Sequence, residues 1–127
     1  MLPTTEQLQA LVRTWQLAQA SHSAGRVAVN LLAGCYNGSR FKFDLTDLRL
    51  LGDAPLRDAL AVITMDARPA REVHDLLNTA LGRRDIGPCL ELLAFGWRIK
   101  GCVKAGEVPE LRQRIDYLNK LAIKEAA

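Results

Sequence analysis

The stretch Phe43-Asp44-Leu45-Thr46-Asp47-Leu48 has the pattern of a helix start. The Asp44 carboxylate is placed to accept a hydrogen bond from the Asp47 backbone N–H, and the Asp47 carboxylate can reach back to the Asp44 N–H. That arrangement is an acidic version of the capping box. Phe43 and Leu48 have the spacing of a hydrophobic staple. We therefore predict that these residues serve structure rather than chemistry, and that a short helix begins at Leu45.

Apolar residues recur at helical spacing on both sides of this stretch. Prolines and glycines separate the periodic segments, and the alternating run at residues 40–43 has no partner strand, so we interpret it as loop. The expected helices cover about residues 5–20, 24–36, 45–52, 54–67, 69–81, 88–97 and 109–122. These patterns predict an all-α fold, a compact single-domain bundle of about six or seven short helices.

The composition is that of an ordinary globular domain. Of 127 residues, 49% are hydrophobic and 24% are charged. The apolar runs are too short for a membrane span, and the N-terminus lacks a basic region followed by an apolar core, so we expect a cytoplasmic protein with no membrane contact. Cys35, Cys89 and Cys102 suit separate, buried thiols in a reducing compartment.

The sequence contains no recognisable set of catalytic or metal-binding residues. His22 and His74 are far apart and lack the spacing of a metal site, and no nucleotide-binding motif is present. Cys89, close to an expected helix start, could have a lowered pKa, although a buried and inert thiol is the better interpretation. We therefore expect no enzymatic activity, no metal and no cofactor.

The formal net charge of +3 arises entirely after Ala80. This asymmetry suggests a division near residue 82, between residues 1–82 and a basic C-terminal helical pair in residues 83–127. Basic residues and one tryptophan gather around the sixth expected helix: Arg83, Arg84, Trp97, Arg98, Lys100 and Lys104. They could contact phosphates and stack on a base, or contact a protein partner. They could instead be solvated residues that oppose a helix dipole, and the low net charge favours this interpretation.

Two helical segments are unusually apolar or carry an apolar stripe that could bind a partner. Residues Cys89–Trp97 contain a single polar residue, Glu91, and such a helix is either central in the core or half-buried in a partner. The last expected helix carries a narrow apolar stripe from Leu111 to Ala122, which suits docking on the domain or on another chain. Either segment could support a homodimer.

Several segments carry a resemblance to a known family. They are Gly25-Arg26-Val27-Ala28, Leu31-Leu32-Ala33, the stretch at residues 43–48, and Asp58-Ala59-Leu60-Ala61-Val62. In this order they resemble an uncharacterised family of small bacterial proteins found on plasmids, integrative elements and prophages. The resemblance covers about Ala24 to Leu77; Gly34-Cys35-Tyr36 stands where tryptophans are expected, and the segment beyond Gly82 is an addition.

The resemblance implies a genetic setting and no particular activity. Small accessory proteins in that setting include inhibitors of host defence systems. We therefore expect a non-enzymatic protein that acts by binding a protein partner. The alternative is a nucleic-acid-binding regulator that uses the basic region after Gly82.

Overall fold

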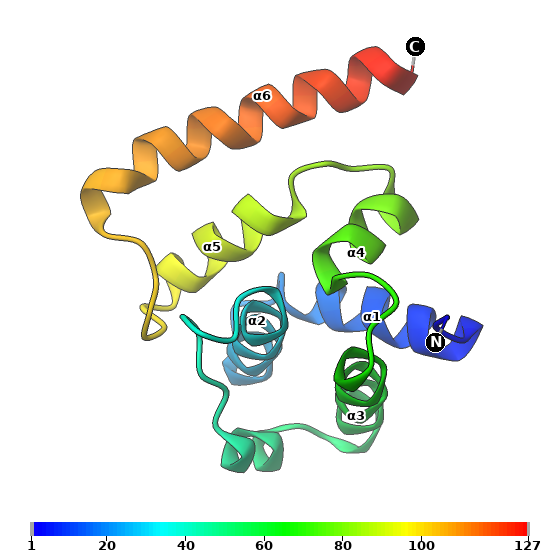
Figure 1. Ribbon diagram of the computed structural model, residues 1–127. Helices are drawn as coiled ribbons and strands as arrows, with labels where there is room; N and C mark the ends of the chain where they lie inside the picture. The colour runs from blue at the N-terminus through cyan, green and yellow to red at the C-terminus, as the bar shows by residue number, and fades with distance from the viewer. Residues whose placement is uncertain (1, 127) are drawn as a thin grey trace.

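Figure 1 shows the computed structural model, which describes residues 2–126. In this range the chain forms six α-helices and two 3₁₀ helices, with no strand, so the predicted all-α bundle is confirmed. The elements are α1 (Thr5–Leu17), α2 (Ser23–Tyr36), the 3₁₀ helix η1 (Leu45–Leu50), α3 (Asp53–Ala67), α4 (Val73–Leu81), α5 (Ile86–Gly96), the 3₁₀ helix η2 (Ala105–Glu107) and α6 (Val108–Ala126). None of the described helices is long and apolar enough to cross a membrane.

The first helix begins at a complete capping box. Thr4 Oγ1 accepts a hydrogen bond from the Gln7 backbone N–H at 3.1 Å, and Gln7 Oε1 accepts one from the Thr4 N–H at 2.9 Å. From this start α1 packs against α3. Arg13 of α1 donates two hydrogen bonds to the Asp58 carboxylate of α3, at 2.9 and 3.0 Å. This ion pair links α1 and α3 at the surface of the bundle.

Two helices supply the centre of the core. Every residue of α2 from Val27 to Ala33 is buried, and α5 adds Leu90 and Ala94. The two helices approach closely at Gly87, where a Cβ atom would lie 2.9 Å from the Tyr36 ring, so this contact depends on the missing side chain. The apolar run at residues 89–97 thus contributes to the core, which is one of the two roles expected for it.

Two helix starts differ from the sequence expectation. Helix α4 begins at Val73 rather than at Pro69, because the chain uses the intervening residues to turn after α3. Helix α5 begins at Ile86, so Pro88 lies inside its first turn, where a missing N–H is tolerated. The end of α4 is as expected, because Gly82 adopts a left-handed conformation with φ of 62°.

The last helix lies on the outside of the bundle. Helix α6 contacts α5 and η2 and runs along the outer side of α5 (Figure 1). Val108 and Leu111 are buried, whereas Ile115 and Leu118 are half-buried. The apolar stripe of α6 is therefore covered by the chain itself at the start of the helix and only partly covered further along.

Candidate partner-binding surfaces

The Phe43–Leu48 stretch forms a capped turn with different partners from those predicted. Asp44 Oδ1 accepts hydrogen bonds from the Thr46 backbone N–H at 2.9 Å and from the Thr46 hydroxyl at 2.8 Å. The reciprocal box between Asp44 and Asp47 does not form, because the Asp47 N–H donates to the Asp44 backbone carbonyl at 3.0 Å, which is the hydrogen bond of the 3₁₀ turn. The hydrogen bonds from Thr46 hold the pKa of Asp44 below its ordinary value.

Two contacts attach this turn to α2. Asp47 pairs with Arg26 of α2 at 3.5 Å, so its carboxylate points to the neighbouring helix instead of back along its own. Phe43 is half-buried beside Gly34, and its Cβ lies 3.8 Å from the position that a Cβ on Gly34 would take. Leu48, the predicted partner of Phe43 in a staple, is also half-buried. The orientation of η1 is therefore set by α2.

The leucines of η1 lie on the surface. The segment and its last cap contain Leu45, Leu48, Leu50 and Leu51, and none of them is buried. Leu45 is 72% exposed and Leu50 is 49% exposed. Large apolar side chains that gather on one element and face water indicate a binding surface, whereas single ones are ordinary. We call these four residues the η1 leucine surface.

The predicted basic cluster is divided between the two ends of α5. Arg83 and Arg84 precede this helix and the other basic residues follow it, so its 11 residues separate the two groups by about 16 Å. Arg98, Lys100 and Lys104 are exposed beyond the C-terminal end of α5, where basic residues oppose the helix dipole. The six predicted residues therefore do not form one continuous surface.

Trp97 and Arg84 also have contacts within the chain. Trp97 is half-buried and packs against the core, which limits its use as a platform for a base. Arg84 forms an ion pair with Glu125 of α6. Both side chains of that pair are about half exposed, so the pair is a surface contact.

Arg83 is held by a buried carboxylate. Its Nε and Nη2 atoms donate hydrogen bonds to the two oxygens of Asp85, each at 2.8 Å, and Asp85 is fully buried. The guanidinium carbon also lies 5.5 Å from the centre of the Trp15 ring. Arg83 therefore fixes the connection between α4 and α5, and its Nε and Nη2 donors are already directed at Asp85.

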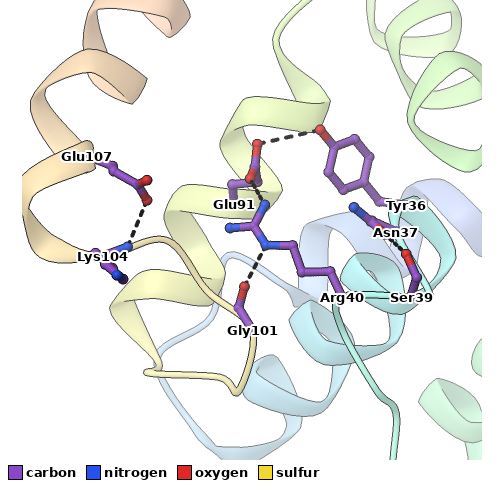
Figure 2. A network of polar contacts seen from close by, with 8 residues as sticks. All are labelled: Tyr36, Asn37, Ser39, Arg40, Glu91, Gly101, Lys104 and Glu107. Carbon is purple, nitrogen blue, oxygen red and sulfur yellow. Dashed lines mark hydrogen bonds and ion pairs between the residues drawn. The ribbon is translucent and has the colours of Figure 1, made fainter.

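A second buried carboxylate joins α2, α5 and the loop that precedes η2 (Figure 2). Glu91 accepts hydrogen bonds from Arg40 and, at 3.5 Å, from the Tyr36 hydroxyl. Arg40 Nε donates to the Gly101 carbonyl at 2.7 Å. Burial, and then the nearby Glu91 carboxylate, raises the pKa of Tyr36, so the phenol keeps its proton and acts as a donor. This network holds three parts of the chain together.

The hollow beside this network has balanced charge. It has a volume of about 320 Å³, and the charged residues that line it are Arg40, Arg114, Glu107 and Glu110. Two cations and two anions give the hollow no preference for a ligand of one sign. The network is therefore best understood as a structural element.

Cys35 and Cys89 are weak nucleophiles. Burial, followed by the carboxylate of Asp85, raises the pKa of Cys89 to about 12, which is opposite to the lowered value considered for a thiol at a helix start. Burial, followed by the carboxylate of Asp66, likewise raises the pKa of Cys35 to about 12. Within residues 2–126, no three His, Cys, Asp or Glu side chains gather as a metal site would require.

The chain is thus a small helical bundle with a capped 3₁₀ turn on its surface and two buried carboxylates along α5. It belongs to a family of unknown function, DUF7673, whose model matches residues 8–91. The match runs from α1 into α5, so it includes η1 and excludes η2 and α6. A comparison with curated proteins and a comparison with solved structures each gave no significant match.

Proposed function

We propose that this chain is a small, non-enzymatic protein that acts by binding another protein through the η1 leucine surface. The observation that carries the proposal is the group of four leucines at residues 45–51 with no buried member. Covering Leu45 and Leu50 with an apolar partner would contribute about 1–2 kcal/mol for each side chain. The partner surface that fits is an apolar groove wide enough for a short helical turn.

The η1 leucine surface is held in place by the chain itself. The Asp44 cap fixes the start of the turn, and the Arg26–Asp47 ion pair fixes it to α2. A partner therefore binds a preformed element and spends little free energy on ordering it, which favours affinity. The η1 leucine surface also lies inside the region that matches the family. The proposal can therefore be tested on other members of the family.

The proposed setting is a bacterial mobile genetic element. It rests on the resemblance of residues 24–77 to small proteins of plasmids, integrative elements and prophages. In that setting, a host defence protein is a suitable class of partner, and inhibition by occupying its apolar groove would need no catalytic residue. The proposed site of action is the cytoplasm.

A nucleic-acid-binding regulator is the second candidate function. It rests on the three exposed cations between α5 and η2, namely Arg98, Lys100 and Lys104. Three phosphate contacts would give a salt dependence with a slope of about −2.7 in a logarithmic plot of affinity against salt concentration. A mobility shift that weakens in this way would support the second candidate, and absent or salt-insensitive binding would exclude it.

The leading proposal is tested by comparing surface variants. The tagged wild-type chain, a Leu45→Glu/Leu50→Glu variant and a Leu60→Glu control are each used to capture proteins from a bacterial host lysate. The captured protein is then identified and its affinity measured with purified components. Leu60 is a matched control because it is 47% exposed but lies on α3, outside the η1 leucine surface.

We expect the η1 variant to bind the purified partner at least about tenfold more weakly than the wild type, and the Leu60 variant to bind as the wild type does. Circular dichroism and urea unfolding establish that all three chains are folded. A partner that binds the η1 variant and the wild type equally would refute the proposed surface. A strictly monomeric chain that captures nothing would refute protein binding itself.

A further inference from the structure

One flank of α6 carries a row of residues beside the apolar stripe that faces the domain, and its first two members, Glu110 and Arg114, also line the hollow next to Arg40. The row follows the spacing of successive helix turns and consists of Glu110, Arg114, Tyr117, Leu121 and Lys124. Tyr117 is 61% exposed, and Leu121 next to it is half-buried. Within residues 2–126, none of the charged members of the row forms an ion pair. The row is therefore an apolar centre between unpaired charges.

Two of the three charges in this row, those of Glu110 and Lys124, are arranged symmetrically about Tyr117. Glu110 precedes Tyr117 by two helix turns and Lys124 follows it by two turns, so each charge lies about 10 Å from the tyrosine. A two-fold axis at Tyr117 would place Glu110 of one antiparallel helix beside Lys124 of the other, twice. A parallel pair would instead bring like charges together. The row is thus complementary to itself in the antiparallel arrangement only.

We propose that two copies of this chain associate through antiparallel pairing of α6 along the row from Glu110 to Lys124. The two tyrosines meet at the centre, where an amphipathic ring is well suited to an interface. The two Glu110–Lys124 pairs close the ends and set the direction and register. This interface uses the row on the flank of α6 rather than the Leu111–Ala122 stripe as a whole, because Leu111 is already buried within its own chain.

The position of α6 leaves room for this contact. The helix is peripheral and packs on the domain mainly through α5 and η2, with the Arg84–Glu125 ion pair as a further contact. It lies at the opposite end of the molecule from η1 (Figure 1), so self-association leaves the η1 leucine surface open. The inference is therefore independent of the proposed function, and either can fail alone.

Sedimentation of the full chain over a range of concentrations, at low and at high salt, tests the proposal. We expect a monomer–dimer equilibrium in which Glu110→Lys or Lys124→Glu alone weakens the dimer about tenfold, because each creates two like-charge contacts. The double variant Glu110→Lys/Lys124→Glu should restore the wild-type dissociation constant. Tyr117→Glu should abolish the dimer.

Ile123→Glu is the matched control, because Ile123 is 71% exposed on the same helix but lies on the opposite flank. This variant should dimerise as the wild type does. A monomer at every concentration would overturn the proposal, as would a double charge reversal that fails to restore the dimer. Equal weakening by Ile123→Glu and Tyr117→Glu would overturn the assigned face.

Discussion

Replacing Arg83 by methionine should destabilise the fold far more than the same change at the neighbouring Arg84. Arg83→Met leaves the fully buried carboxylate of Asp85 without its cationic partner. Removal of one member of a buried ion pair costs about 3–5 kcal/mol, and loss of the contact with Trp15 adds about 0.5 kcal/mol. Because the Arg83 side chain is itself partly open to water, we expect a value near the lower limit, about 3 kcal/mol.

Arg84→Met removes an ion pair in which both side chains are about half exposed. Such surface pairs contribute about 0–1 kcal/mol, so the expected change is small. For a domain of this size, 1 kcal/mol corresponds to about 4 °C in Tm. The predicted shifts are therefore about 12 °C for Arg83→Met and less than about 4 °C for Arg84→Met.

Urea unfolding followed by far-UV circular dichroism measures both losses. A third variant, Arg83→Met/Asp85→Leu, removes the pair as a whole and should recover part of the stability lost by Arg83→Met, since no charge is then left buried. Equal losses for the two single variants would refute the structural role given to Arg83. So would a double variant that is less stable than Arg83→Met alone.

Three further predictions concern pH, backbone geometry and thiol reactivity. Burial raises the pKa of Asp85, but hydrogen bonds from its arginine and thiol neighbours outweigh burial and leave the pKa below its ordinary value. The ionised Asp85 therefore stabilises the fold fully at neutral pH. This stabilisation is lost as the pH falls below about 4 through the folded-state pKa. The Asp85→Asn variant should be less stable than the wild type at pH 7 and should lose less stability than the wild type in acid. Parallel profiles of the free energy of unfolding against pH for the two proteins would contradict this prediction. Gly101→Ala should cost more than about 2 kcal/mol, because φ is +95° and the new Cβ would lie 2.2 Å from the Arg40 carbonyl oxygen. The control Gly106→Ala, which meets open space, should change the free energy of unfolding by less than about 0.5 kcal/mol. Cys89 in the folded protein should react with a maleimide at pH 8 on the order of 100-fold more slowly than a free thiol, because its pKa is about 12; equal rates, measured by mass spectrometry of the labelled peptide, would be inconsistent with that environment.

The features predicted correctly from the sequence depend on residues close together in the chain. The expected start of the first helix at residue 5 and the expected end of the fifth at residue 81 are both confirmed, and the structure attributes them to the Thr4–Gln7 cap and to the left-handed Gly82. Each of these follows from the chemistry of one or two neighbouring side chains. The all-α fold follows in the same way, because apolar residues repeat at helical spacing over most of the chain.

The stretch at residues 43–48 adopts a conformation that its own sequence does not determine. Its sequence is compatible with an α-helical start and with a 3₁₀ turn, and in the observed 3₁₀ turn the Asp47 N–H donates to the Asp44 carbonyl rather than to its carboxylate. The Asp47 carboxylate pairs with Arg26 of α2, a partner that lies outside the stretch. The exposure of Leu45 likewise depends on what packs nearby, which its own spacing does not specify.

The partners of the charged residues in the C-terminal half are not specified by the residues next to them. Arg83 and Arg84 are adjacent and chemically identical, yet one is paired with a buried carboxylate and the other with a surface one. Glu91 stood out as a polar residue in an apolar run, but its partner Arg40 is 51 positions away. Long-range pairing of this kind is set by the packing of helices and leaves no periodic signal in the sequence.

The family match ends at Glu91, within α5, but the hydrophobic core of this protein continues beyond that residue. Ala94 and Ile99 are buried and lie beyond that point, and so does the Gly101 carbonyl that Arg40 binds. A protein truncated at Glu91 would end on a buried carboxylate and place its C-terminal carboxylate beside it. It would also expose the face of α2 that the rest of α5 covers. The smallest part of this protein that can fold alone therefore extends beyond the region shared with its family, through Gly101 or further.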